Sequence, residues 1–81
     1  MNVDVIRQAV VAALCEVAPE IDPAKLDAAA ELRSTLDLDS MDFLNFMIAV
    51  KEATGVEVPE RDYPQVSTLR GCTEYVAAHA P

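Results

Sequence analysis

Residues 36–42 read Leu-Asp-Leu-Asp-Ser-Met-Asp, and they directly precede the most apolar helical segment of the chain, residues 43–50. Asn45 is the one polar residue inside that segment, which continues through Lys51 and reaches Gly55. Glycine is common just past the last turn of a helix, because it adopts the left-handed conformation without strain. The run therefore predicts one helix that starts close to residue 40 and ends before Gly55.

Asp39 and Ser40 mark the start of this helix. Asp39 suits the N-cap, where a short side-chain oxygen accepts from an unpaired amide, and Asp42 adds negative charge near the positive end of the helix dipole. Ser40 then holds the first helical position, where its hydroxyl can point into solvent and carry a phosphodiester, because a helix N-terminus favours an anion. The alternative is that Asp39 and Ser40 only cap the helix, and the tripeptide alone favours this simpler interpretation.

Length and composition limit the class of protein. The chain has 81 residues, 52% of them hydrophobic, which suffices for one small core but leaves little room for an active-site cavity. Its two glycines are too few for a turn-rich all-β fold. We therefore expect a single domain over residues 1–81.

The charge balance indicates which partners the chain suits. Six Lys and Arg against fourteen Asp and Glu give a formal net charge of −8. This argues against nucleic acid, whose binding draws on clustered cations. An acidic surface suits partners with basic patches, although acidity can also serve solubility alone. No segment is long and apolar enough to span a membrane and no secretory signal begins the chain, so we expect a cytoplasmic protein.

An enzyme is the least expected class. The sequence has no paired histidine and nucleophile, no glycine-rich phosphate loop and no histidine-carboxylate metal cluster. The aspartates at 37, 39 and 42 lack the glycine and distal glutamate of a calcium loop, so no metal site is predicted. Cys15 and Cys72 show no metal-ligand spacing, and we predict that both are small core residues.

A helix and a long loop are predicted before the central helix. The helix covers residues 3–18, with Asn2 as its cap. Residues 19–39 are too many for an ordinary connection, and we expect an ordered loop that packs on its apolar side chains. Helical turns are predicted from Asp22 and at residues 28–30. The apolar residues of the loop are Ile21, Leu26, Leu32, Leu36 and Leu38.

The chain after Gly55 predicts a short turn and a last helix. Residues 56–58 precede a proline and are expected to be extended. One short turn is predicted at residues 60–63, before Pro64, and Ser67 is predicted to cap the last helix. Gly71 lowers the stability of that helix relative to alanine, and we explain its presence by the close approach of another helix at this position. The residues expected to face inward are Leu69, Cys72, Tyr75 and Val76.

The sum is an all-α fold with three main helices, one short helix and a long first loop. With its size, its acidity and Asp-Ser-Met at residues 39–41, the chain resembles an acyl carrier protein of the phosphopantetheine-dependent family, a four-helix bundle. The resemblance covers nearly the whole chain. In that family the attachment motif is Asp-Ser-Leu, and methionine replaces leucine here with little change in size. The family's extended Ile/Val-Pro element after the second helix is matched by Val-Glu-Val-Pro at residues 56–59.

This resemblance implies that Ser40 carries a covalent 4′-phosphopantetheine group taken from coenzyme A, and that Asp39 helps to present it. The sequence places no base beside Ser40, and its one histidine, His79, lies two residues from the C-terminus. Activation of Ser40 is therefore assigned to a phosphopantetheinyl transferase with its magnesium, and this protein is a substrate rather than a catalyst. The arm would carry acyl intermediates as thioesters between acyl-loading and acyl-processing enzymes of fatty acid, polyketide or related biosynthesis. We expect a monomer.

The resemblance also places the partner-binding surface on the second main helix. That face is usually acidic in the family, but here Asn45 and Lys51 stand where glutamate is frequent, and Phe43 and Ile48 add apolar surface unless they turn inward. We expect contacts that depend more on apolar packing and less on salt. Asp37 is a further departure, because a glycine is common at its position. The predicted partner-binding residues are Met41, Asp42, Leu44, Asn45 and Ile48.

Two alternatives remain open. A peptidyl or aminoacyl carrier would use the same serine and arm but load an amino acid, and overall acidity favours an acyl carrier only weakly. A small acidic interaction module without a covalent cofactor would use Ser40 only as part of a helix cap.

Overall fold

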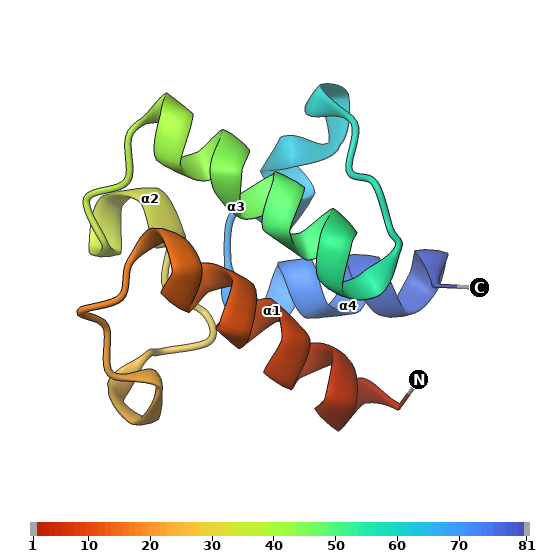
Figure 1. The fold of residues 1–81 in the computed structure, drawn as a ribbon, viewed down its shortest axis with the longest axis horizontal. Coiled ribbons are helices and arrows are strands. Elements are labelled where there is room, and N and C mark those ends of the chain that lie inside the picture. Colours follow the sequence, from red (N-terminus) through yellow and green to blue (C-terminus); the bar gives the residue numbers. More distant parts are fainter. Residues whose placement is uncertain (1, 81) are drawn as a thin grey trace.

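Three long helices, α1 (Val3–Val17), α3 (Ser40–Thr54) and α4 (Leu69–His79), form the body of the protein in the computed structural model, which describes residues 2–80 (Figure 1). Helix α1 packs against both α3 and α4, and α4 also contacts the 3₁₀-helix η2 (Glu60–Val66). The 3₁₀-helix η1 (Pro23–Lys25) and the short helix α2 (Leu32–Thr35) lie in the connection between α1 and α3. The all-α bundle predicted from the sequence is confirmed.

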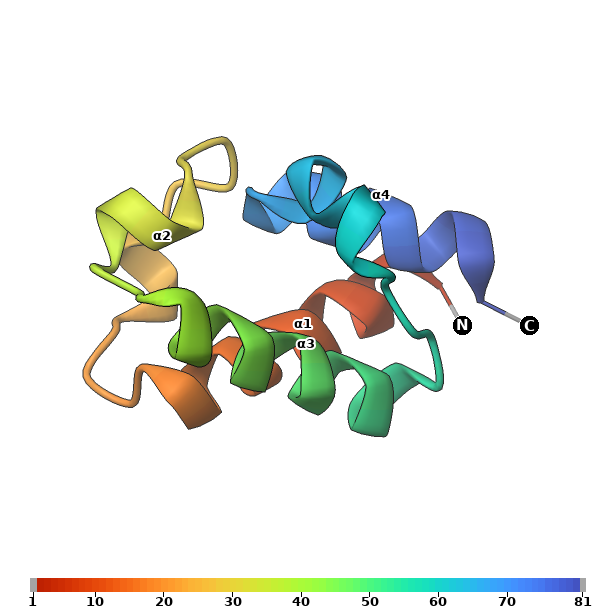
Figure 2. The same ribbon diagram turned by 90° about the horizontal axis from the view of Figure 1, so that it is seen from above.

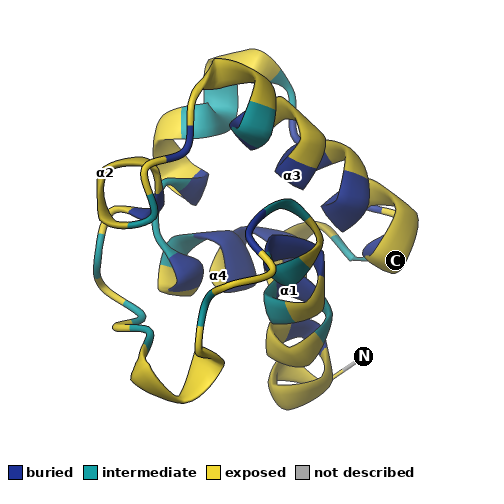
Figure 3. Ribbon diagram, turned by 60° about the vertical axis from the view of Figure 1, so that its left-hand side comes forward, coloured by how far each residue is buried: buried dark blue, intermediate teal, exposed yellow. Residues whose placement is uncertain are grey.

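The core consists of aliphatic and aromatic side chains from the facing sides of these helices. Exposed residues follow the outer faces of the ribbon and buried residues its inner faces (Figure 3). A side chain that is fully removed from water contributes about 1.5–3 kcal/mol, so this cluster is the main source of stability. The largest fully buried side chains are Phe46, Ile6, Leu14, Leu32, Leu69, Val10, Val50, Val66, Val76 and Cys72.

Side chains cap the three long helices. Asn2 accepts from the amide of Val5 at 2.8 Å and starts α1, which ends one residue earlier than predicted. Helix α3 ends at Gly55, whose φ of 78° is left-handed as expected for this C-cap. The cap of α4 is Thr68, whose Oγ1 accepts from the amide of Gly71 at 2.9 Å. The prediction of Ser67 as this cap is wrong by one residue, because the Ser67 hydroxyl donates instead to the carbonyl of Pro64.

The long connection between α1 and α3 is ordered but differs in part from the prediction. The turn from Asp22 is confirmed, with its carboxylate accepting from the amide of Ala24 at 3.0 Å. The turn predicted at residues 28–30 is present as a hydrogen-bonded turn, in which the Ala30 amide donates to the Asp27 carbonyl at 3.1 Å, but it is not helical. The sequence analysis missed α2, which is capped by Glu31 and inserts the fully buried Leu32 into the core.

The segment after α3 returns along the bundle. Residues 56–59 have no regular structure, consistent with the predicted extended run, and Val56 and Val58 are buried. The short turn predicted at residues 60–63 is longer than expected, because η2 continues through Pro64 to Val66. A 3₁₀-helix of seven residues is longer than most, and packing of Val66 and Tyr63 against the core holds it in place.

Both ends of the described chain lie at the same end of the bundle. Figures 1 and 2 show the start of α1 and the end of α4 close together, on the opposite side from the start of α3. None of the helices between residues 2 and 80 combines the length and hydropathy needed to span a bilayer.

Candidate functional site

Ser40 is the first residue of α3, and its side chain is exposed. A reciprocal pair of hydrogen bonds fixes the helix start around it. Asp39 Oδ1 accepts from the amide of Asp42 at 2.8 Å, and Asp42 Oδ2 accepts from the amide of Asp39 at 3.2 Å. The predicted N-cap role of Asp39 is confirmed, and the hydroxyl of Ser40 takes no part in capping.

The backbone turn before Ser40 depends on two neighbouring residues. Asp37 has a φ of 55°, the one left-handed non-glycine residue between residues 2 and 80. Leu38 is buried, and its amide donates to the carbonyl of Arg33 at 2.8 Å. Aspartate tolerates the left-handed region better than most L-residues, which explains how Asp37 can occupy this position without a glycine.

A contact that was not expected from the sequence connects α2 with Ser40. Arg33 Nη2 donates to Ser40 Oγ at 3.3 Å, from a position seven residues earlier in the chain. The sequence alone does not predict that Arg33 and Ser40 lie in contact, because the turn at Asp37 and Leu38 brings the two side chains together. A guanidinium has only N–H donors and no acceptor, so Arg33 cannot act as a base toward the serine hydroxyl.

Two adjoining grooves open beside Ser40. One, of about 300 Å³, runs between the start of α3 and η2; the other, of about 390 Å³, continues toward Pro64 and Ser67. Both grooves share Arg33, Phe43 and Tyr63 in their walls. The rings of Phe43 and Tyr63 meet edge to face with centroids 5.3 Å apart, so the shared floor is aromatic.

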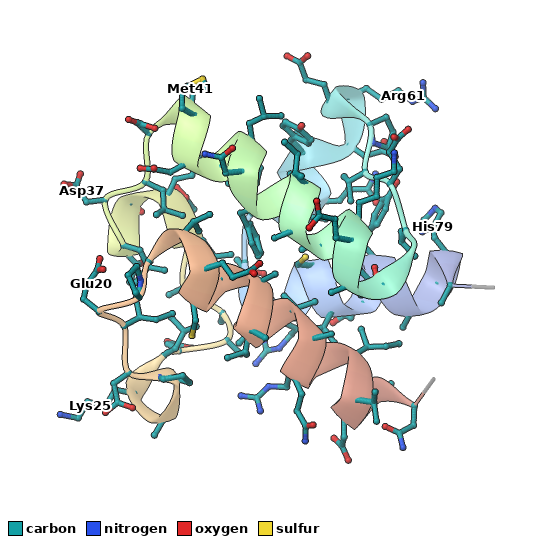
Figure 4. All side chains as sticks on the ribbon, in the orientation of Figure 1. Glu20, Lys25, Asp37, Met41, Arg61 and His79 are labelled. Atoms are coloured by element: carbon teal, nitrogen blue, oxygen red, sulfur yellow. The ribbon has the colours of Figure 1, made fainter. Side chains whose placement is uncertain are left out.

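The outer face of α3 presents three apolar side chains to solvent. Met41, Leu44 and Ile48 are 63%, 41% and 48% exposed, whereas Phe43 turns inward and is only 4% exposed. Figure 4 shows Met41 pointing away from the bundle at the start of α3. Asn45 is exposed beside them. The predicted accessibility of the apolar stripe on this helix is therefore confirmed, and we name Met41, Leu44 and Ile48 the apolar face.

Carboxylates flank this apolar face on the side of α1. A groove between α1 and α3 is lined by Glu16, Asp42 and Glu52 together with Asn45 and Ile48. The single cation on α3, Lys51, donates to Glu57 Oε1 at 2.7 Å. This hydrogen bond raises the pKa of Lys51 and lowers the pKa of Glu57. The positive charge at Lys51 is thus paired locally.

Other titratable groups lie away from Ser40. His79 is at the far end of the bundle (Figure 4), where its ring stacks on Tyr75. No group of three His, Cys, Asp or Glu side chains in the described chain is arranged to hold a metal ion. Cys72 is buried as predicted and Cys15 is only half-buried, so the expectation that both are core residues is wrong for Cys15. Its position at the edge of α1, near the long connection, leaves one side uncovered.

A sequence profile described as "Phosphopantetheine attachment site" matches residues 8–76. The chain belongs to this family. Its members carry 4′-phosphopantetheine, so the cofactor predicted for this carrier protein is confirmed at the level of the family.

The curated relatives of this carrier protein are named acyl carrier proteins. It is 27% identical over 59 residues to "Acyl carrier protein" of Rubrobacter xylanophilus, covering 73% of each chain. It is 29% identical over 59 residues to "Acyl carrier protein" of Lactobacillus johnsonii, covering 73% of this chain and 74% of that one. A match of 27% over 60 residues to "Acyl carrier protein 2, mitochondrial" of Arabidopsis thaliana covers 74% of this chain and 48% of the relative. The resemblance to acyl carrier proteins noted from the sequence is confirmed.

The residues around Ser40 fit the phosphate of this cofactor. The hydroxyl is exposed, and a guanidinium donor already contacts its oxygen. The aromatic and apolar walls of the adjoining grooves suit the largely uncharged pantetheine chain. The Asp39 carboxylate already occupies the amide of Asp42, so the expectation that free helix amides favour the anion rests on the amides of Ser40 and Met41.

Proposed function

We propose that this protein carries acyl intermediates as thioesters on a 4′-phosphopantetheine arm attached to Ser40. It delivers them to partner enzymes of fatty acid, polyketide or related biosynthesis. The observation that carries the proposal is the exposed Ser40 hydroxyl at the start of α3, free of the capping bonds that fix the helix. A serine that served only as a cap would accept from a helix amide, and here Asp39 does so.

Attachment is a phosphoryl transfer in which this chain supplies the nucleophile. Ser40 Oγ forms a bond to the phosphorus of coenzyme A that bears the pantetheine, the adenosine bisphosphate leaves, and the hydroxyl proton passes to a base on the transferase. The attached arm supplies a terminal thiol that holds an acyl group as a thioester. Asp39 and Asp42 keep the helix start rigid, so Ser40 enters the transferase site in one orientation.

The apolar face and its neighbours form the proposed docking surface for the transferase and the acyl-processing enzymes. Met41, Leu44 and Ile48 supply buried contact area on binding, while Asp42 and Asn45 supply polar contacts at the edge. The carboxylates of Glu16 and Glu52 favour a partner with a basic rim. Tethering the cargo to this surface gives a high effective concentration at each enzyme.

The remaining expectations belong to the same proposal. We propose that residues 1–81 act as a single carrier domain, that the domain works as a monomer and that it is located in the cytoplasm. The Arabidopsis relative and one from Neurospora crassa bear the word mitochondrial in their names, so localisation needs its own measurement.

A peptidyl or aminoacyl carrier is the second candidate, because the same serine and arm would serve it. The names of the relatives favour acyl cargo. The family match favours a carrier over an interaction module without a cofactor. Incubating the loaded protein with acyl-activating and with aminoacyl-activating enzymes separates the two carrier types, since only one class of thioester should form.

Intact-protein mass spectrometry tests the attachment itself. The protein is incubated with coenzyme A, magnesium and a broad-specificity phosphopantetheinyl transferase, beside Ser40→Ala and Ser34→Ala. Ser34 is a matched control, because it is exposed on α2 and its hydroxyl only donates to the Glu31 carbonyl. We expect one added arm on the wild type and on Ser34→Ala, and none on Ser40→Ala. Addition to Ser40→Ala, or none to folded wild type, would refute the proposal.

A further inference from the structure

Arg33 stands out among the cations of this acidic chain. The sequence holds fourteen Asp and Glu against six Lys and Arg, yet the one ion pair between residues 2 and 80 joins Lys51 to Glu57. The guanidinium of Arg33 contacts a neutral hydroxyl instead, with Nη2 at 3.3 Å from Ser40 Oγ. Arg7, Lys25, Arg61 and Arg70 form no ion pair within this range either, so it is the contact with Ser40 Oγ that distinguishes Arg33 and suggests a place for an anion there.

The surroundings of Ser40 otherwise repel an anion. Asp39 and Asp42 place two carboxylates in the first turn of α3, and they occupy each other's amides. Asp37 adds a third carboxylate two residues before Asp39. A phosphodiester on Ser40 would add a further negative charge, which the helix dipole only partly offsets. Among the described residues, Arg33 is the cation in contact with this oxygen.

We infer that Arg33 binds the phosphate of the 4′-phosphopantetheine arm and fixes the first segment of the arm against the protein. This inference rests on the proposed attachment at Ser40. The oxygen that Arg33 contacts becomes the ester oxygen of the phosphodiester, so the two unesterified phosphate oxygens lie two bonds beyond it. A planar guanidinium can donate to both of them through two parallel N–H groups, a fixed geometry that an ammonium does not offer.

The position of Arg33 also gives the arm a direction. Arg33 lines both grooves beside Ser40, and Phe43 and Tyr63 form their shared floor. A phosphate held by Arg33 places the following pantetheine carbons at the mouth of these grooves. The arm then leaves on the α2 and η2 side of α3, which keeps Ile48 and Asn45 on the α1 side uncovered for a partner.

Nuclear magnetic resonance on the wild-type protein tests the contact without any substitution. Uniformly ¹⁵N-labelled protein is compared before and after arm attachment, with loading verified by mass. We expect the side-chain N–H signals of Arg33 to shift and to exchange more slowly with solvent once the phosphate is present, while those of Arg61 stay unchanged. Arg61 is exposed on η2, and in Figure 4 it points away from Met41, which follows Ser40 in the chain. Unchanged Arg33 signals in fully loaded protein would overturn the inference.

Variants measure the coupling between Arg33 and the arm. Arg33→Gln, Arg33→Lys and the control Arg61→Gln are each prepared with and without the arm, and their unfolding equilibria and ³¹P signals are compared. In the wild type, the contact between Arg33 and the phosphate should lower the equilibrium constant of unfolding. In Arg33→Gln this contribution is lost, so attaching the arm should leave that constant about twofold to fivefold higher than attaching it in the wild type does, as for an exposed ion pair. Arg33→Lys should restore part of this effect, and Arg61→Gln should match the wild type.

The outcomes separate this inference from the proposed function. Absence of an arm on Ser40 would defeat both. An arm on Ser40 whose ³¹P signal and effect on unfolding are the same in Arg33→Gln and wild type would defeat the role of Arg33 alone. The role of Arg33 is supported if the ³¹P signal and the effect of the arm on unfolding change in Arg33→Gln but not in Arg61→Gln. Added salt should weaken this change.

Discussion

The hydroxyl of Tyr75 donates to Asp62 Oδ2 at 2.6 Å and joins α4 to η2 across thirteen residues of sequence. Tyr75 is 6% exposed, and its ring stacks on His79 at a centroid distance of 4.0 Å. Asp62 lies next to Tyr63, which contributes to the grooves beside Ser40. This hydrogen bond therefore helps to hold one wall of the proposed arm-binding site.

Replacing Tyr75 by phenylalanine should lower the melting temperature by a few degrees, because Asp62 loses its donor while the packed ring is kept. The hydrogen bond to Asp62 raises the pKa of Tyr75 above its ordinary value of 10.0. The folded state thus favours the protonated phenol, so this stabilisation is present below pH 10 and is lost as the pH rises through the raised pKa. Thermal unfolding at several alkaline pH values should show this loss in the wild type and not in Tyr75→Phe. Equal pH dependence in both would contradict it.

The two cysteines should differ sharply in reactivity. Burial raises the pKa of Cys72 to about 12, so on the order of one thiol in ten thousand is ionised at pH 8. Cys15 is half-buried and accessible on one side. We expect iodoacetamide to modify Cys15 in the native protein and Cys72 only after unfolding, as read by peptide mass spectrometry. Rapid native labelling of Cys72 would show that α4 opens easily. Labels aimed at the arm's thiol will accordingly need Cys15→Ser protein.

Gly71→Ala should destabilise the protein although alanine is the better helix former. A Cβ at this position would lie 2.5 Å from the backbone carbonyl oxygen of Gln65, so η2 and α4 would have to separate. We expect a net loss of about 2 kcal/mol in urea unfolding, from overpacking that exceeds the propensity gain of ~1 kcal/mol. Gly55→Ala is a useful comparison, because a Cβ at residue 55 would meet no atom within 4 Å. This variant should lose stability only because its backbone φ of 78° is unfavourable for alanine. If Gly71→Ala left the free energy of unfolding unchanged, η2 would be able to move away from α4 without loss of stability, contrary to this prediction.

Substitutions at Asp37 should report the left-handed backbone before Ser40. Asp37→Ala should cost about 1 kcal/mol at a φ of 55°, while Asp37→Asn should be nearly neutral, because asparagine tolerates this region. Both variants remove the same charge, so the difference between their free energies of unfolding in urea measures the cost of the left-handed backbone alone. Equal stability of the two would indicate that the loop changes conformation in Asp37→Ala.

Polar substitutions on the apolar face should weaken partner binding without unfolding the protein. Leu44→Gln and Ile48→Gln remove exposed apolar area, and we expect each to lower kcat/KM of the transferase by about tenfold. Val5→Gln is the matched control, since Val5 is an exposed apolar residue on α1. Circular dichroism should show native helix content in all three. Loading rates unaffected by Leu44→Gln and Ile48→Gln would remove α3 from the docking surface.

The sequence was sufficient to predict those helices whose start, end and buried face are determined by residues close together in the chain. Asn2, Asp39 and Gly55 each act on the nearest turn of backbone, and apolar periodicity identified the buried faces of α1, α3 and α4. The serine, its cap and the exposed Met41 followed from the same local pattern. These features depend on neighbours within four residues, which a single sequence displays directly.

The missed features depend on contacts between distant segments. Helix α2 forms where the amide of Leu32 donates to the Ser67 carbonyl and Glu31 pairs with Thr68, more than thirty residues later. The contact between Arg33 and Ser40 requires the left-handed turn at Asp37. Propensity within the connection could not reveal such pairings, because its sequence from residue 31 to 35 has only one buried apolar residue.

The placement of the chain ends has a practical result for measuring how the protein works. Since α1 begins and α4 ends at the end of the bundle away from the start of α3, a linker at either end would emerge on the opposite side from Ser40 (Figure 1). Molecules immobilised on a sensor through an end-linked tag would therefore all present Ser40 and the apolar face to the solution. Association rates recorded on such a surface would need no correction for blocked orientations.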